Sequence, residues 1–128
     1  MDVFNLDGTP GLPGKAVRLI SRGALNSLWG LAIAPPPFAG LSAAGNDPVL
    51  LVGNFGDGLL HPFDATTPGP GVGQLTDPDG ERIQIDGLWA LKVGNDGAGG
   101  KSNTVCFTAG SFGESHGLFG SPTTAADR

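Results

Sequence analysis

The chain has 128 residues, enough for one domain, and its 7 basic and 12 acidic side chains give a net charge of −5. Nucleic-acid-binding proteins usually present a basic stripe. Here only Lys15, Arg18 and Arg22 cluster, so we expect no nucleic-acid partner. The single cysteine, Cys106, excludes an intrachain disulfide and a cysteine-based metal site, and no apolar run is long enough to span a membrane.

The 23 glycines and 11 prolines would suggest disorder in a polar chain. Two tryptophans, seven phenylalanines and several apolar runs argue against disorder, because such side chains drive the formation of a core. Short strands joined by Gly/Pro turns satisfy both observations. The composition therefore predicts an all-β fold.

The first predicted strands are 2–5 and 15–20, which we interpret as the third and fourth strands of a unit that ends near residue 22. The next predicted strand is 29–34. The phrase Leu-Trp-Gly-Leu-Ala-Ile begins one residue before it, at Leu28, and Leu-Trp-Ala-Leu-Lys-Val follows sixty residues later in strand 88–93. In both copies Trp, Leu and Ile or Val alternate, so an unbroken strand would place them on one face. We therefore expect Trp29 and Trp89 to lie in the core.

The remaining predicted strands extend this repeat. Residues 23–80 would form a complete four-stranded unit, and residues 81–128 an incomplete one. The strands expected after the tryptophan strands are 48–53, 59–64 and 72–76 in the first unit, and 103–109 and 116–120 in the second. Serial four-stranded antiparallel units are typical of β-propellers. The prediction is one domain, 1–128, forming a partial β-propeller of about two and a half blades, with a two-layer β-sandwich as the alternative.

The candidate binding residues lie in the turns after the second strands. Asn54 and Asp57 in "GNFGDG" align with the turn of "FGESHG", which holds Glu114 and His116. Loops of successive propeller blades converge on a central funnel, where these groups could bind a ligand, and where Glu114 and His116 could act as an acid–base pair or as metal ligands. The alternative is that they only stabilise tight turns.

A calcium site is a second possibility, because "TDPDGERIQID" resembles a calcium-binding loop. An EF-hand with Gly80 at its sixth position would need its first ligand at Leu75, which has no side-chain oxygen. The segment is therefore expected to form an Asp-Pro-Asp-Gly turn. We predict no cofactor, with calcium left as a possibility.

The phrases "LNSLWGLAIAP", "LLVGNFGDG", "IDGLWALKVGN" and "FTAGSFGESHGLFG", in this order, resemble the C-terminal part of a bacterial family of exported propeller-like proteins. Some members of that family carry a PEP-CTERM sorting tail, and the pattern is more distantly similar to NHL-type propellers. The resemblance implies a fragment of a longer exported protein in an extracellular or periplasmic compartment. Its partners would be the missing blades, or other copies that associate through exposed sheet edges.

No motif defines a biochemical activity. The first hypothesis is a structural, ligand-binding or partner-binding module without catalysis. The second is a propeller enzyme, lactonase-like or dehydrogenase-like, with a metal or an acid–base group in the funnel. The third is a protein-interaction propeller with an exposed aromatic rim.

Overall fold

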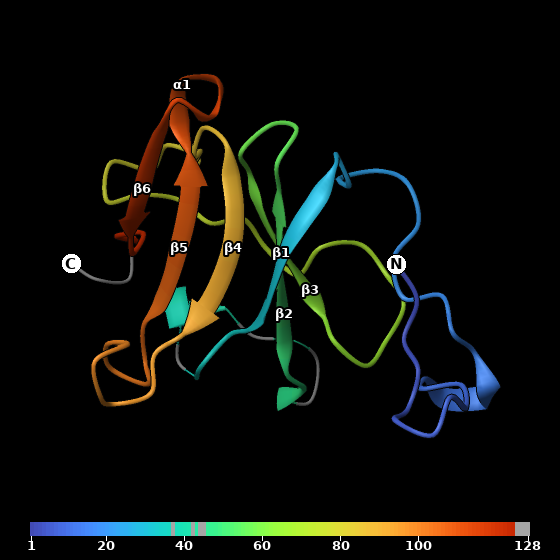
Figure 1. Ribbon diagram of the computed structural model, residues 1–128. Helices are drawn as coiled ribbons and strands as arrows, with labels where there is room; N and C mark the ends of the chain where they lie inside the picture. Colours follow the sequence, from blue (N-terminus) through green and yellow to red (C-terminus); the bar gives the residue numbers. More distant parts are fainter. Residues whose placement is uncertain (37, 42, 44–45, 125–128) are drawn as a thin grey trace.

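The computed structural model describes residues 1–36, 38–41, 43 and 46–124. It is all-β, with two antiparallel three-stranded sheets and little helix (Figure 1). Parts of the predicted loop before the second strand (37, 42 and 44–45) and the end of the last predicted unit (125–128) lie outside the described residues.

Each sheet follows the order of the chain. Sheet 1 contains β1 (Leu28–Ile33), β2 (Val49–Asn54) and β3 (Leu60–Asp64), and sheet 2 contains β4 (Leu88–Val93), β5 (Val105–Gly110) and β6 (His116–Gly120). These strands match six of the predicted strands to within two residues. The remaining elements are the short helical turns η1 (Pro13–Lys15), η2 (Phe38–Gly40) and α1 (Ser111–Glu114).

Each of the two sheets has a β-bulge at its tryptophan. In sheet 1 Leu28 pairs with Asn54 and Gly30 with Gly53, so Trp29 has no partner of its own. In sheet 2 Leu88 pairs with Ala109 and Ala90 with Thr108, which leaves Trp89 in the same position. The expectation that both indoles lie in the core is wrong: Trp29 is 60% exposed and Trp89 37% exposed. Beyond the bulge the side chains of β1 still alternate, and Trp29, Leu31 and Ile33 share a face that is largely exposed.

Sheet 1 packs against other segments on both faces, but its far face stays exposed over β1. One hydrophobic cluster lies between the sheets and joins Leu51 and Leu60 of sheet 1 to Leu88 and Val105 of sheet 2. The other lies on the far face of sheet 1 and is formed by these residues: Leu12, Leu19, Ile20, Val52 and Phe63. Burial of each such side chain contributes about 1.5–3 kcal/mol. The molecule thus consists of an N-terminal segment, sheet 1 and sheet 2 in successive layers.

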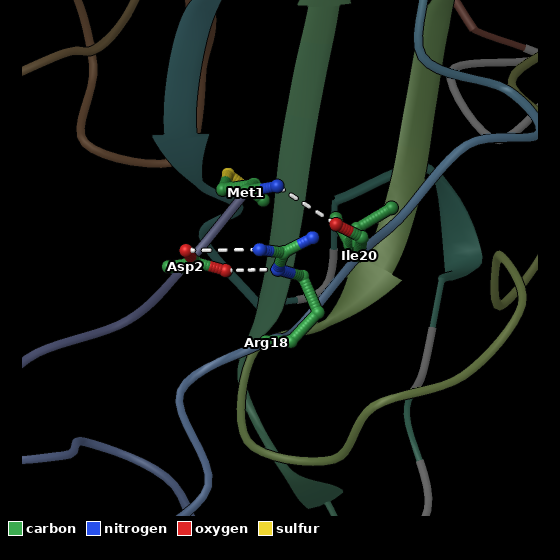
Figure 2. Close-up of polar contacts among 4 residues, drawn as sticks. All are labelled: Met1, Asp2, Arg18 and Ile20. Atoms are coloured by element: carbon green, nitrogen blue, oxygen red, sulfur yellow. Dashed lines mark hydrogen bonds and ion pairs between the residues drawn. The ribbon is translucent and has the colours of Figure 1, made fainter.

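The N-terminal layer is held by polar contacts between the chain start and residues 18–20. The Met1 ammonium group donates to the Ile20 carbonyl oxygen at 2.7 Å, and the Arg18 guanidinium forms an ion pair with Asp2 (Figure 2). Asp2 and Arg18 also form an isolated antiparallel bridge. The predicted strands 2–5 and 15–20 therefore lie side by side, but as single bridges without a regular ladder.

The predicted fourth strand 72–76 is also not formed. Its contact with β3 is a hydrogen bond from Val72 N to Pro62 O at 2.9 Å. Glycines at 71 and 73 flank this residue, and glycine weakens a strand because it supplies no side chain for packing. The segment follows the edge of sheet 1 as irregular chain.

Glycines allow the two sheets to approach closely. A Cβ at Gly53 would lie 2.8 Å from Leu88 Cδ2, and a Cβ at Gly30 would lie 3.1 Å from Leu91 Cγ. Strand β4 therefore packs its leucines against the glycines of β1 and β2. Figure 1 shows β1 and β4 side by side at the centre of the molecule, with β3 and β6 on the outside.

Candidate functional site

The turn between β2 and β3 holds Asp57 in a network of hydrogen bonds. Its carboxylate accepts from Leu59 N at 3.0 Å, from Asn26 Nδ2 at 3.3 Å and from Asn54 Nδ2 at 3.4 Å. Its backbone carbonyl accepts from Gln84 Nε2 at 2.7 Å. These contacts tie the turn to the segments that precede β1 and β4, so Asp57 has a structural part in the turn.

Asn54 is fully buried at the end of β2. Its Nδ2 donates to the Ala24 carbonyl oxygen at 2.7 Å, while its Oδ1 has no hydrogen-bond partner. A buried polar atom of this kind is commonly satisfied by an ordered water. The Nδ2 contact fastens the chain before β1 to the β2–β3 turn, and a ligand-binding role of Asn54 stays a prediction.

The turn between β5 and β6 has a different backbone conformation. Phe112, Gly113 and Glu114 of α1 have φ values of 55°, 63° and 66°, which form a left-handed turn. Each non-glycine residue in this region costs roughly 1–2 kcal/mol. The Asp86 carboxylate supports the turn by accepting from Phe112 N at 2.9 Å. Strained backbone is often found at functional sites.

This left-handed turn presents Glu114, Ser115 and His116 to solvent. The Ser115 hydroxyl donates to the Phe112 carbonyl oxygen at 2.8 Å, and Ser115 Oγ lies 2.9 Å from His116 Nδ1. Because the hydroxyl proton is already used, Nδ1–H must donate to Oγ, and a neutral imidazole then leaves Nε2 as a free acceptor. This direction is opposite to that of an activated nucleophile, in which the imidazole accepts the hydroxyl proton.

The bulged tryptophans form an aromatic cluster beside the turns. The Trp29 and Trp89 rings meet edge to face with centroids 5.2 Å apart, and Phe55 contacts Trp89 at 5.9 Å. Sequence reasoning placed the indoles in the core and so missed this cluster. The only sequence signal for this cluster was the tryptophan repeated in both units, because no local sequence pattern reveals a bulge.

The structure brings the predicted site residues together only in pairs. Asn54 and Asp57 share the first turn, whereas Glu114 and His116 line an open groove at the second turn, beside Trp89. Both turns lie at the same end of the molecule (Figure 1). Among the described residues, no hydrogen bond or ion pair joins the two pairs.

The predicted calcium segment forms a turn around Asp77. The Asp77 carboxylate accepts from Asp79 N and Glu81 N, each at 2.9 Å. Across the described parts of the chain, no three or more His, Cys, Asp or Glu side chains are grouped so that they could hold a metal ion. Calcium binding stays a prediction.

The surroundings of His61 on β3 disfavour the charged form of its imidazole. Burial lowers its pKa below the ordinary value of 6.5, Asp57 opposes this shift, and Arg82 adds to it. Its Nε2 is buried without a hydrogen-bond partner. Sequence analysis did not select this residue.

Comparison with known proteins gives two curated relatives, both uncharacterized proteins of Acanthamoeba polyphaga mimivirus. The first is 40% identical over 91 residues, which covers 71% of this chain and 20% of the relative. The second is 38% identical over 92 residues, covering 71% of this chain and 21% of the relative. The chain thus spans about a fifth of the length of the curated relatives it matches. No family model matches, and no solved structure matches.

These findings correct the resemblance inferred from the sequence. The relatives are viral, and no family model matches, so membership of a bacterial exported propeller family is contradicted. Export, a sorting tail and an extracellular or periplasmic location followed from that resemblance and lose their support with it. Among the described residues, no helix is long and apolar enough to cross a membrane.

Proposed function

We propose that this chain is a structural and partner-binding module without catalysis, made of successive units of a longer array. The observation that carries the proposal is an apolar strip on β1, formed by Trp29, Leu31 and Ile33. Leu31 is 46% exposed and Ile33 is 50% exposed. The corresponding leucine of sheet 2, Leu91, is only 6% exposed because sheet 1 covers it.

The repeat indicates what would cover this strip. Leu91 packs against the glycines of β1 and β2, since Cβ atoms at Gly30 and Gly53 would lie 3.1 and 3.4 Å from its side chain. A preceding unit of the same kind would offer the same shallow surface to Leu31. The viral relatives are about five times as long as the matched segment, which leaves room for further units. The partner we propose is therefore a preceding unit of the same polypeptide.

The finer architecture we propose is a partial β-propeller. Three features support it: β1 and β4 lie side by side, each sheet runs outward in the same strand order, and the sheets pack face to face. Segment 71–76, which follows the edge of β3, would be an irregular fourth strand. Radial stacking of this kind protects the strand edges.

A chain lengthened by one unit tests the proposal. Residue 84 corresponds to residue 24 in the sixty-residue repeat, so joining residues 1–83 to residues 24–128 duplicates one unit in phase. We expect one cooperative urea transition at a higher midpoint than in the original chain. Leu31→Ser in the second copy should cost about 1.5–3 kcal/mol, because that copy is covered.

The matched control is Leu31→Ser in the original chain, where the half-exposed side chain should contribute less than about 1 kcal/mol. Two separate transitions, or equal losses in the covered and uncovered positions, would show that the units do not pack on this strip. Either result would refute the proposal.

A further inference from the structure

The unit that contains sheet 1 (unit 1) and the unit that contains sheet 2 (unit 2) differ most at the turns that follow their second strands, β2 and β5. In unit 1, the segment leading to β4 packs on this turn: Ile85 N donates to Gly58 O at 2.8 Å, and Leu59 forms a bridge with Gln84. A Cβ at Gly58 would lie 2.4 Å from the Ile85 carbonyl oxygen, so this packing requires glycine. Strand pairing places Gly117 of unit 2 where unit 1 has Gly58. A Cβ at Gly117 would lie within 4 Å of no atom beyond its chain neighbours, so the packing at Gly58 has no counterpart among the described residues of unit 2.

An open groove takes the place of this packing in unit 2. Its volume is about 340 Å³, at the lower end of the range for small-molecule sites. Its lining residues include Trp89, Thr108, Gly110, Glu114, Ser115 and His116. A Cβ at Gly110 would lie 3.2 Å from Trp89 Nε1 and 3.3 Å from Glu114 Cγ, so the indole and the Glu114 side chain both approach this glycine.

We propose that this groove binds a neutral saccharide. A sugar ring has an apolar face formed by C–H groups, which suits the partly exposed indole of Trp89. Its hydroxyl groups both donate and accept hydrogen bonds. The groove offers the Glu114 carboxylate and the free His116 Nε2 as acceptors, and the Thr108 and Ser115 hydroxyls as mixed groups.

The charges of the residues that line the groove argue against an anionic ligand. No Lys or Arg is among the lining residues, and Glu114 would repel a phosphate or a carboxylate. A cationic ligand would gain little, because an ion pair at so exposed a carboxylate is worth roughly 0–1 kcal/mol. The remaining mode of recognition is stacking on the indole combined with several neutral hydrogen bonds, and a saccharide can form both. The site lies on unit 2 alone and does not require the packing of further units.

Nuclear magnetic resonance of the whole chain tests this site directly. The chain has two tryptophans, so its spectrum contains two indole N–H signals, and Trp29→Phe identifies the signal of Trp89. Cellobiose, maltose and diacetylchitobiose would be titrated separately into the protein. We expect at least one of them to shift the Trp89 signal more than the Trp29 signal, with a Kd on the order of 1 mM.

Two variants on the exposed turn then measure the polar contacts. Glu114→Gln and His116→Gln should each weaken the binding of that sugar about two- to fivefold, the loss expected for a hydrogen bond at a solvent-exposed group. Glu81→Gln is the matched control, because it removes an exposed carboxylate from a different loop and should leave the affinity unchanged.

Three results would overturn the proposal. They are the absence of any shift of the Trp89 signal with all three sugars, equal affinities for Glu114→Gln and the unmodified chain, and a Trp89 shift that tetramethylammonium produces and the sugars do not. The last result would assign the groove to cations, which bind over aromatic rings.

Discussion

Replacing each tryptophan by alanine should reveal the different environments of the two equivalent bulges. Trp29 is 60% exposed and Trp89 37% exposed, so with about 250 Å² for a tryptophan side chain, Trp89 buries about 60 Å² more. At about 25 cal/mol per Å², this area corresponds to ~1.5 kcal/mol. Loss of the Phe55–Trp89 contact adds about 0.5–1.5 kcal/mol to the Trp89 variant only. Trp89→Ala should therefore destabilise the chain by about 2–3 kcal/mol more than Trp29→Ala.

Urea unfolding followed by far-ultraviolet circular dichroism measures this difference without depending on the fluorophore that is removed. The double variant supplies an internal control. Because the rings are in edge-to-face contact, the two losses should be coupled by about 0.5–1.5 kcal/mol. Equal losses for the two single variants, or a larger loss at Trp29, would refute the reasoning from exposure.

Three further outcomes follow from packing, backbone geometry and titration. Leu88→Ala, at a side chain with no exposure, should cost about 2–5 kcal/mol in urea unfolding, well above the loss for Leu31→Ala at the uncovered strip. Gly58→Ala should lower the melting temperature more than Gly80→Ala: both glycines have positive φ, but only at Gly58 would a Cβ meet a backbone oxygen. Because burial lowers the folded-state pKa of His61, the unfolded chain binds the proton more readily, so stability should be full above pH 6.5 and fall as the pH drops below it. His61→Gln should remove that part of the pH dependence, and an unchanged pH profile would contradict the assignment.

Much of the fold was readable from one repeated phrase. The spacing of Trp29 and Trp89 gave the period of sixty, and the apolar runs that follow them gave the hairpins of both sheets. The bulges were not readable, because an alternating pattern does not reveal where one residue is left without a partner. The weaker predicted strands, such as 72–76, failed because their few apolar residues stand between glycines, and backbone pairing there did not propagate.

The candidate site was readable in part. Alignment of the two turns selected polar residues that lie at one end of the molecule, but it treated Asp57 and Glu114 as equivalent. Asp57 is held by backbone and amide donors, whereas Glu114 stands exposed on a left-handed turn. The conformational difference depends on contacts with the segment that leads to β4, and these contacts are distant in sequence.

The two sheets also differ in the surface that each would offer to a following unit. Strand pairing places Thr108 of β5 where sheet 1 has Gly53, the glycine that receives Leu88. Lys92 likewise stands where β1 has Ala32. A following unit of the same kind would have to bury the Lys92 amine. It would also meet the Thr108 side chain at the position where the interface between sheet 1 and sheet 2 has a glycine. Both changes disfavour close packing. In the proposed array, the side of Trp29 therefore suits packing by a like unit and the side of Thr108 does not, which leaves the groove at Trp89 accessible to a small ligand.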